Sequence, residues 1–445
     1  MNTPPLTMDE LDELDWSPPE ITSIEESGLS HGFLEDLALK VMYFRGQISG
    51  YEVSEHMHLP FQNVVSSILD FLKREQMCEV KGSVRSGLGE GSWQYTLTEK
   101  GASRARERID RTSYVGPAPV PWEVYLAAIK AQGGKQVKVN PDIMTKVLSH
   151  LVMEDSLFHK IGPAVNSGKS IFLYGPPGNG KTTIAESIGR MILGGDMYIP
   201  YAVEVDGQII QVYDEVNHVA VNESDLPHSG AGLMMNKKRR QDARWIKIRR
   251  PVIMVGGELT LEGLELNYDQ TNKYYEAPFQ MKANGGMFLI DDFGRQQVRP
   301  RDLLNRWIVP MEKQIDFLAL HTGRKLEVPF EVLIVFSTNL PPRDLVDEAF
   351  LRRIRHKIEV TSPTYDVFRK IFKRVCEARD LPYDEQMVVY LLQEYYVKQN
   401  RKLRANHPRD LLDQMEDIVH YREVPFRLTK ELIDRAAESY FVDLY

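Results

Sequence analysis

The sequence predicts an α/β fold, with a parallel sheet at its centre, a helical domain behind it and a small module in front. Three observations indicate this arrangement. A short apolar segment at residues 170–174 runs directly into a glycine-rich loop and a helical pattern. Two further apolar segments, residues 287–290 and 332–336, end in polar side chains, as buried strands of parallel sheets do. A proline-rich stretch, residues 116–121, cannot continue a helix and separates the module from the core.

Size and composition limit the class of protein. The 445 residues exceed one ordinary hydrophobic core, so two or three domains are expected. The chain is 42% hydrophobic and 27% charged, and its longest apolar runs are too short to span a bilayer, so no membrane segment is expected. Cys78 and Cys376 are too few for a disulfide framework, and the first residues do not resemble a secretory signal. We therefore expect a cytoplasmic protein.

The net charge of −8 is concentrated at the N-terminus, because residues 1–30 hold eight acids and no Lys or Arg. We interpret residues 1–30 as an acidic, disordered tail, although its few apolar residues could dock on a partner. Residues 31–116 hold 11 bases and 11 acids. Their three helical patterns, two short strands and last helix resemble a winged-helix domain, in which Val64, Val65, Ile68, Leu69 and Leu72 form the buried stripe of the third helix. Residues 117–121 are the expected linker.

Residues 175–182 read GPPGNGKT and lie between a strand pattern and a helical pattern. Glycines let backbone N–H groups close around phosphate oxygens at the amino end of a helix. In this interpretation Lys181 contacts the outer phosphates, and the hydroxyl of Thr182 is a ligand of Mg²⁺. The predicted nucleotide-binding residues are Gly175, Pro176, Pro177, Gly178, Asn179, Gly180, Lys181, Thr182 and Thr183.

Two later segments bring polar side chains to the same edge of the sheet. Asp291 and Asp292 follow the apolar residues 287–290, and Asn339 follows residues 332–338. Ligands of parallel sheets bind outside the carboxyl ends of the strands. We expect Asp291 to hold Mg²⁺ through water and Asp292 to orient or deprotonate the attacking water. Asn339 would position water near the γ-phosphate.

With these three motifs in order, the chain resembles the AAA+ ATPases, in which they are Walker A, Walker B and sensor 1. The resemblance covers about residues 122–445 and implies an ATPase core at residues 122–360, a helical lid at residues 361–445, and ATP and Mg²⁺ as cofactors. Residues 349–360 look like the segment that projects arginine fingers into a neighbouring subunit. Arg352 and Arg353 match it best, and Arg355 is a further candidate. Residues 407–412 are similar to the sensor 2 segment, which implies that Arg409 contacts the γ-phosphate; a structural ion pair is the alternative.

Two features depart from the common AAA+ pattern. Asp292 stands where these proteins usually carry Glu, and its shorter side chain predicts slow hydrolysis or hydrolysis that depends on closure between subunits. Lys181 and Asp291 lie 291−181=110 positions apart, which predicts insertions near residues 196–250 and 258–282. In the first, Asp206 and Gly207 predict a hairpin turn. The basic stretch after it, residues 237–250, is interpreted as a solvated or acid-paired face, with nucleic-acid contact as the alternative.

The second insertion resembles that of the AAA+ clade whose second helix is interrupted by a hairpin. That clade includes transcriptional activators, magnesium chelatase subunits and MoxR-like chaperones. Because such hairpins face the pore of a ring, Tyr274 and Tyr275 are candidates for gripping a substrate. The alternative is that both tyrosines are ordinary core aromatics.

These features favour an ATPase that acts as a homo-oligomer, by resemblance a ring of six, and remodels a protein partner. The trans arginines imply the oligomer, because a finger comes from a neighbour. One alternative is a DNA-directed AAA+ protein that uses the winged helix, but the balanced charge of residues 31–116 and Asp70 on its recognition helix do not favour nucleic acid. The other alternative is an ATP-gated scaffold with slow turnover.

Overall fold

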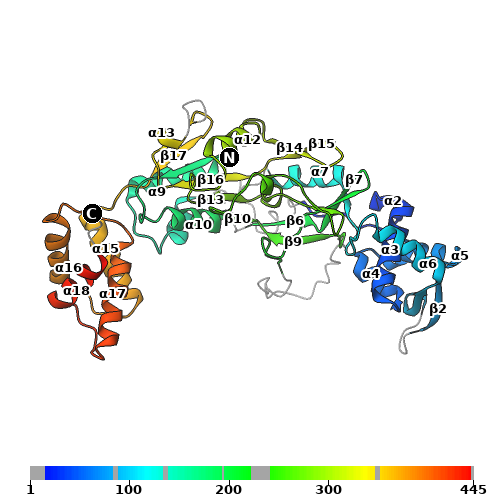
Figure 1. The fold of residues 1–445 in the computed structure, drawn as a ribbon, viewed down its shortest axis with the longest axis horizontal. Coiled ribbons are helices and arrows are strands. Elements are labelled where there is room, and N and C mark those ends of the chain that lie inside the picture. The colour runs from blue at the N-terminus through cyan, green and yellow to red at the C-terminus, as the bar shows by residue number, and fades with distance from the viewer. Residues whose placement is uncertain are drawn as a thin grey trace, which may run out of the picture.

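The computed structural model describes residues 16–83, 89–133, 139–192, 195–221, 241–345 and 351–441. The molecule is elongated, with three parts in a row (Figure 1): the N-terminal module in blue, a central α/β part, and the C-terminal helices in orange and red. Among the described helices, none has both the length and the apolar character needed to cross a membrane.

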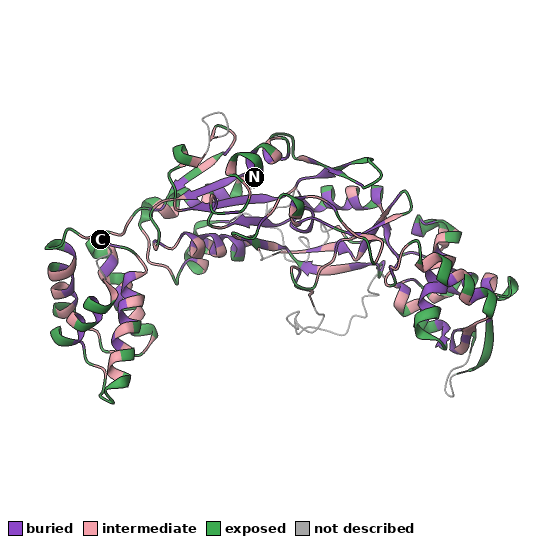
Figure 2. Cartoon of the chain, viewed as in Figure 1, coloured by how far each residue is buried: buried purple, intermediate pink, exposed green. Residues whose placement is uncertain are grey.

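The central part contains a five-stranded parallel sheet. Its strands are β5 (Ile171–Tyr174), β10 (Val252–Val255), β13 (Met287–Ile290), β16 (Leu333–Thr338) and β17 (His356–Glu359). They lie in the order β10-β13-β16-β5-β17, each parallel to its neighbour. The middle strands are buried on both faces, which is why they read as continuous apolar runs in the sequence (Figure 2).

Helices cover both faces of this sheet. Ile171 and Leu173 pack on one face against α8 (Pro141–Val147), α9 (Asp155–Asn166) and α10 (Lys181–Ile192). Phe172 points to the opposite face, as alternation along a strand requires, and packs with Trp307 of α12 (Pro300–Lys313). The short α11 (Phe279–Lys282), η4 (Glu262–Leu264) and α13 (Pro342–Leu345) lie between the longer elements.

The C-terminal helices form a separate domain with its own hydrophobic core. They are α15 (Tyr365–Ala378), α16 (Glu385–Leu392), η5 (Gln393–Val397), α17 (His407–Tyr421) and α18 (Lys430–Tyr440). Phe368, Phe372 and Leu411 are fully buried between them. This helical domain, behind a parallel α/β sheet that carries the glycine-rich loop, confirms the predicted fold class.

The two predicted insertions meet in a second sheet. Its strands are β4 (Val120–Pro121), β7 (Ala202–Val205), β8 (Gln208–Gln211), β11 (Asn267–Asp269) and β12 (Tyr274–Glu276), in the order β11-β12-β8-β7-β4. The predicted turn at Asp206 and Gly207 is confirmed, because β7 and β8 pair around it. One core joins this sheet to α7 (Trp122–Gly133), to the antiparallel pair of β6 (Asp196–Pro200) and β9 (Trp245–Arg249), and to the hairpin of β14 (Ile315–Ala319) and β15 (Lys325–Pro329). The insertions therefore form one unit rather than two.

The predicted linker, residues 117–121, is part of this second sheet. Val120 and Pro121 pair with β7, and Ala118 and Val120 are fully buried. The N–H of Ala118 donates to the carbonyl of Met57 in the module. The module's last helix already ends at Ile109, well before Pro117, and the predicted linker leads into a buried strand rather than forming a free spacer.

The N-terminal module has the predicted order of elements. These are α3 (His31–Arg45), β1 (Ile48–Ser49), α4 (Gly50–Met57), η1 (Phe61–Val65), α5 (Ser66–Arg74), β2 (Cys78–Ser83), η2 (Glu90–Ser92), β3 (Trp93–Leu97) and α6 (Glu99–Ile109). The stripe Val64, Val65, Ile68, Leu69 and Leu72 is fully buried, as predicted. The three strands form one antiparallel sheet in the order β1-β3-β2. The identification of this module as a winged-helix domain stays a prediction.

The predicted disordered tail is wrong for residues 16–30. Ile21 and Leu29 are 4% and 6% exposed and belong to the core of the module, and α2 (Ile24–Ser27) lies between them. Trp16 packs edge-on against Trp245, with ring centroids 5.0 Å apart. The apolar side chains between the acids bury enough surface to order this segment. Residues 1–15 of the predicted tail lie outside the described residues.

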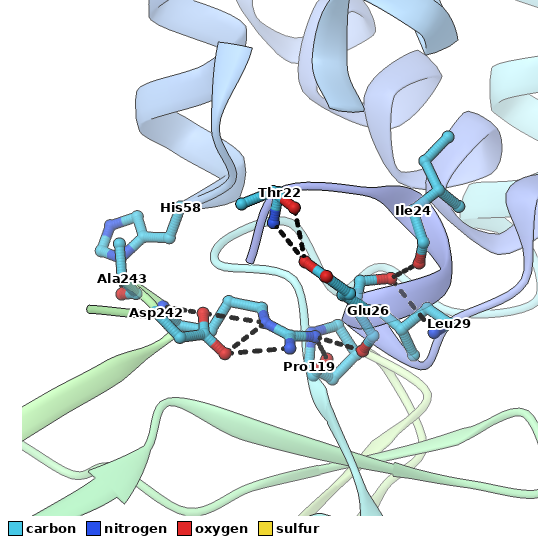
Figure 3. Close-up of polar contacts among 10 residues, drawn as sticks. Thr22, Ile24, Glu26, Leu29, His58, Pro119, Asp242 and Ala243 are labelled. Carbon is cyan, nitrogen blue, oxygen red and sulfur yellow. Dashed lines mark hydrogen bonds and ion pairs between the residues drawn. The ribbon is translucent and has the colours of Figure 1, made fainter. Parts of the chain in front are cut away.

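A buried arginine joins the module to the second sheet. Arg244 is 3% exposed, and its guanidinium donates to the carboxylate of Asp242, with Nη2 and Oδ2 2.9 Å apart. Its Nη1 donates to the carbonyls of Ser27 and Pro119, at 2.9 and 3.0 Å. Figure 3 shows these groups around Pro119 and Asp242, with His58 of the module close by. Three chain segments far apart in sequence thus meet on one side chain.

Replacing Arg244 with Ala is expected to loosen the module. The change leaves the carboxylate of Asp242 buried without its partner and removes the donor from two carbonyls, which costs about 3–5 kcal/mol. Limited proteolysis of the full chain should then cut within residues 112–119 faster than in the wild type, and the first thermal transition should move down. Arg249→Ala, at an exposed position of β9, is the matched control. Equal protection of both variants would contradict this role for Arg244.

Candidate nucleotide-binding site

A pocket of about 950 Å³ lies between the carboxyl edge of the parallel sheet and the helical domain. The predicted motifs contribute Pro177, Gly178, Asn179, Gly180, Lys181, Thr182, Thr183, Asp291, Asp292, Asn339 and Arg409 to its wall. Five parallel strands end at this edge, so residues that are more than 200 positions apart in the sequence share one pocket. The structure therefore brings most of the predicted site together.

The glycine-rich loop turns between β5 and α10. Gly178 has φ +79°, and a Cβ added there would lie 2.2 Å from the Oδ1 of Asn406 in the helical domain. Gly175 has φ +143°, and its Cβ would lie 2.2 Å from the carbonyl oxygen of Val360. Both positions need glycine for backbone conformation and for space. The loop keeps its backbone N–H groups at the amino end of α10, where negative charge is favoured.

Lys181 is held inside the loop. It is 6% exposed, and its Nζ donates to the carbonyls of Gly175 and Pro176, both at 2.9 Å. Burial lowers the pKa of Lys181, while the nearby carboxylates of Asp291 and Asp292 act in the opposite direction. The buried ammonium of Lys181 is suited to bind an anion. Because two carboxylates already lie close to it, the anion has to carry a high negative charge to attract it.

The two acids after β13 each accept a hydrogen bond from a side chain of another predicted motif. The hydroxyl of Thr182 donates to Oδ2 of Asp291 at 2.8 Å. Asn339 donates through Nδ2 to Oδ1 of Asp292 at 2.9 Å. Asp292 has φ +49°, an uncommon backbone conformation for a residue other than glycine that directs its side chain toward Asn339 rather than along the strand. The three motifs predicted from the sequence thus meet through direct hydrogen bonds.

Gln296 supports this turn and was not predicted. Its Nε2 donates to the carbonyls of Asp291 and Asp292, at 3.0 and 3.2 Å, and its Oε1 accepts from the N–H of Gly294. The turn after β13 is therefore fixed from behind by one side chain. No pattern in the sequence marks Gln296, because its role depends on a local fold of the backbone.

The oxygen atoms beside the loop fit a magnesium ion. A hydroxyl from Thr182 and a carboxylate from Asp291 lie side by side, and hydroxyl, carboxylate and water oxygens are the ligands that Mg²⁺ prefers. The ammonium of Lys181 donates to the backbone carbonyls of Gly175 and Pro176, so these hydrogen bonds leave the oxygens of Thr182 and Asp291 available. The residues present thus fit the predicted metal ligands.

The helical domain and the residues before β5 supply an apolar wall that was not predicted. It is formed by Leu151, Val152, Met153, Leu157, Val367, Ile371 and Val375. These side chains come from the loop before α9, from the first turn of α9 and from α15. An apolar wall beside a phosphate-type loop is suited to a flat ring such as a nucleobase. Sequence periodicity shows only that such faces are apolar and does not show which pocket they line.

Arg409 lies at the start of α17, on the wall of the pocket. Its side chain is 64% exposed, and its Nε donates to Asp410 at 3.2 Å. An exposed ion pair of this kind contributes little to stability, so the position of Arg409 on the pocket is the more informative property. Its remaining guanidinium N–H groups are suited to an anion in the pocket.

Arg352 and Arg353 do not line this pocket. They precede β17, whose first residue, His356, pairs with Ile171 at the amino end of β5. The glycine-rich loop follows the other end of β5, one strand length or about 13 Å away. Arg353 forms an ion pair with Glu312 at 2.5 Å, and Arg352 and Arg355 are exposed. From this position the three arginines are better placed to reach the pocket of another chain than the pocket of their own chain.

Of the two interpretations of Tyr274 and Tyr275, the core aromatic is confirmed for Tyr275, and substrate gripping by Tyr274 stays a prediction. Tyr275 is 1% exposed, and its ring is packed against Tyr268 and His321 inside the core of the second sheet. Tyr274 is half-buried and packs edge-on against Tyr114 of the module, with centroids 5.6 Å apart. The hairpin of β11 and β12 is held because β12 pairs in parallel with β8. The aromatic side chains therefore hold the module and the second sheet together.

Two sequence comparisons match parts of the chain. A family model described as "Domain of unknown function (DUF8689)" matches residues 364–439, which are the C-terminal helices. A "Vesicle-fusing ATPase" of Dictyostelium discoideum is 43% identical over 91 residues, or 20% of this chain. The match covers 12% of that protein's length, so it relates part of this chain to an ATPase and leaves the activity of the whole chain to be proposed.

Solved structures with a similar arrangement include the RuvB Holliday junction branch migration motor of Thermotoga maritima. It has a TM-score of 0.37 and 12% identity, over 66% of this chain and 71% of that one. NtrX from Brucella abortus in complex with ADP has a TM-score of 0.38 and 13% identity, over 75% of this chain and 64% of that one. Since both TM-scores are below 0.5, the fold is assigned from the strand order and from the loop between β5 and α10. The fold and the partial ATPase match agree with the predicted AAA+ type; the narrower branch stays a prediction.

Replacing Gly178 with Ala is expected to weaken nucleotide binding at least about tenfold. A Cβ at this positive φ is strained, and it would also collide with Asn406 and displace the loop. Gly207→Ala is the matched control, because Gly207 has φ +75° with nothing within 4 Å of the added Cβ and lies in the turn between β7 and β8. Binding is measured with a fluorescent ATP analogue, and melting temperatures correct for any loss of folding. Equal affinities of the two variants would contradict a binding role for the loop.

Proposed function

We propose that this chain is an ATP hydrolase of the AAA+ type that acts as a ring-shaped homo-oligomer, by resemblance a hexamer, and remodels a protein partner. One observation carries the ATPase part. Thr182 is hydrogen-bonded to Asp291 and Asn339 to Asp292, and all four line one pocket together with Lys181 of the glycine-rich loop. Chance seldom brings a phosphate-type loop, two carboxylates and a carboxamide together at one sheet edge.

In this proposal the phosphates of ATP bind to the backbone N–H groups of the loop and to Lys181. Thr182 and Asp291 would hold Mg²⁺, which would supply positive charge next to the phosphates. Asp292 accepts a hydrogen bond from the attacking water, and Asn339 fixes the carboxylate of Asp292 by donating to its other oxygen. Arg409 contacts the outer phosphate from the helical domain. The apolar wall from Leu151 to Met153 receives the base.

The rate of ATP hydrolysis separates a motor from a slow scaffold, and this rate depends on how well Asp292 activates water. The hydrogen bond from Asn339 and the support of Gln296 hold its carboxylate in one place, which offsets part of the disadvantage of a side chain shorter than Glu. This preorganisation favours turnover over an ATP-gated scaffold. The carboxylate of Asp292 still reaches less far from the backbone than that of a Glu would, because its side chain is one methylene shorter.

Asp292→Asn is expected to lower turnover about a hundredfold or more and to leave ATP affinity within about threefold, because the carboxamide keeps the shape but cannot accept a proton. Asp292→Glu should keep measurable turnover. Steady-state phosphate release and ATP binding are measured on the same samples. Unchanged turnover in Asp292→Asn would exclude Asp292 as the residue that activates water, and slow turnover with tight binding in the wild type would favour the scaffold.

The positions of Arg352 and Arg353 support an oligomer. Both lie at the amino edge of the sheet, away from the pocket of their own chain, and an arginine that stabilises transferring phosphate from there serves a neighbouring subunit. A closed ring follows from a repeated contact of this head-to-tail kind. Arg355 is a third candidate for the same role.

A mixing experiment tests action in trans. Arg352→Ala/Arg353→Ala chains and Lys181→Ala chains are each expected to hydrolyse ATP at least about a hundredfold more slowly than wild type. Mixed in equal amounts, they should regain part of the activity, because each intact loop then meets intact arginines on a neighbour. Arg343→Ala, at an exposed position away from this edge, serves as the control. Failure of every mixture to exceed the sum of its components would remove the support for trans arginines.

The charges of the module support a protein partner rather than duplex DNA. Arg104 and Arg108 of α6 form ion pairs with Asp36 of α3, and Arg111 pairs with Glu107. On the exposed face of α5, Lys73 pairs with Asp70. Cations that are already paired release fewer counterions on binding to phosphate, so they contribute less to nucleic-acid affinity. The partner itself is identified only as a protein.

A further inference from the structure

The helical domain is bonded directly to the middle of the glycine-rich loop. The N–H of Asn406 donates to the carbonyl of Gly178 at 2.8 Å, and the N–H of Ala405 donates to Oδ1 of Asn179 at 3.2 Å. Asn179 is 6% exposed, and its Nδ2 donates to Ser362 at 3.4 Å. Residues 362 and 405–406 lead into α15 and α17, so both entrances to the helical domain are tied to this loop.

One rigid peptide unit connects these contacts to the phosphate site. The carbonyl of Gly178 and the N–H of Asn179 belong to the same planar peptide group. The carbonyl accepts from Asn406, whereas the N–H of Asn179 donates to no group in the part of the chain that the structure describes. A phosphate that draws this N–H toward itself turns the carbonyl at the other end, and Asn406 moves with it.

The side chain of Asn406 extends the connection to Arg409. Its Nδ2 donates to Oδ2 of Asp410 at 2.7 Å, and Oδ1 of Asp410 accepts from Nε of Arg409 at 3.2 Å. Tyr440 of α18 also donates to Oδ2 of Asp410, at 2.9 Å, and fixes this carboxylate from behind. A chain of hydrogen bonds thus runs from Gly178 through Asn406 and Asp410 to Arg409.

The Oδ1 of Asn406 is buried and has no hydrogen-bond partner among the described residues. It lies over Gly178, at the place where a Cβ would be. A buried carboxamide oxygen without a donor is a costly arrangement that a small shift of the loop or of Asn406 would relieve. The contact is therefore suited to two arrangements rather than one.

We propose that Asn406 and Asp410 are positioning residues that couple the state of the glycine-rich loop to the orientation of Arg409 over the same pocket. This inference rests on the proposed ATPase function and names its internal regulation. Asp410 accepts a hydrogen bond from Nε of Arg409 only. This contact orients the guanidinium and leaves its other N–H groups available to bind an anion. An exposed arginine without this contact would lose more rotamer freedom on reaching a phosphate.

The test is a double-mutant cycle on the full-length chain. Asn406→Ala is expected to lower kcat roughly tenfold while KM for ATP and affinity for ADP stay within about twofold, because binding to the loop is kept and only the placement of Arg409 is lost. Arg409→Ala is expected to lower kcat by at least as much. The double variant should be no slower than Arg409→Ala alone, since Asn406 acts through that arginine.

Two further variants separate positioning from folding. Asn406→Asp keeps the size of the side chain but replaces the donor to Asp410 with a second carboxylate, so it should lower kcat at least as much as Asn406→Ala. Lys402→Ala, at an exposed position of the same loop, is the matched control and should leave kcat unchanged. Melting temperatures of all variants are compared, and Asn406→Asp replaces Asn406→Ala in the cycle if the latter is unstable.

Additive losses in the double variant, or wild-type kcat in both Asn406 variants, would overturn the proposed coupling. Lys181→Ala distinguishes this result from failure of the proposed function. If Lys181→Ala hydrolyses ATP as fast as wild type, the pocket is not the ATPase site, whatever the Asn406 variants do. If Lys181→Ala is inactive and the Asn406 variants are normal, the ATPase site stands and only the coupling is wrong.

Discussion

The site depends on the parallel register of three neighbouring strands. β13, β16 and β5 pair so that Ile290 lies opposite Phe336, and Thr338 lies opposite Tyr174. Parallel strands end at one edge, so the residues that follow them meet there whatever their separation in the sequence. If one strand shifted by a single residue, its apolar side chains would turn to the wrong faces and the polar residues that follow would leave the site. The hydrophobic packing of the sheet therefore sets the geometry of the polar pocket.

A second constraint joins the other parts of the molecule to this sheet. The second sheet combines the linker with parts of both insertions and shares one core with the hairpin of β14 and β15. The module is attached to it by Arg244 and by the packing of Tyr114 on Tyr274. The helical domain is attached differently, through polar contacts with the glycine-rich loop at Gly178 and Asn179. Buried apolar surface resists motion, whereas a few exposed or half-buried hydrogen bonds open at low cost. Motion driven by nucleotide is thus expected between the core and the helical domain.

The hairpin of β11 and β12 is attached on two sides. Tyr274 packs against Tyr114 of the module, and Tyr275 packs against His321 in the loop between β14 and β15. The module and both insertions therefore form one connected unit.

The sequence by itself determined the P-loop, the acids and the carboxamide at the strand ends, the apolar strands and the order of the domains. Each of these features follows from a local pattern. A glycine-rich loop, an apolar strand and the polar residues after it can each be recognised within about ten residues of sequence. Only the tertiary structure decided that residues 16–30 are packed, that the linker is a strand, and that Gln296, Asn406 and Asp410 support the site. Those outcomes depend on contacts between segments from far apart, such as Arg244 with Ser27, and a buried polar contact has no periodic signature in the sequence.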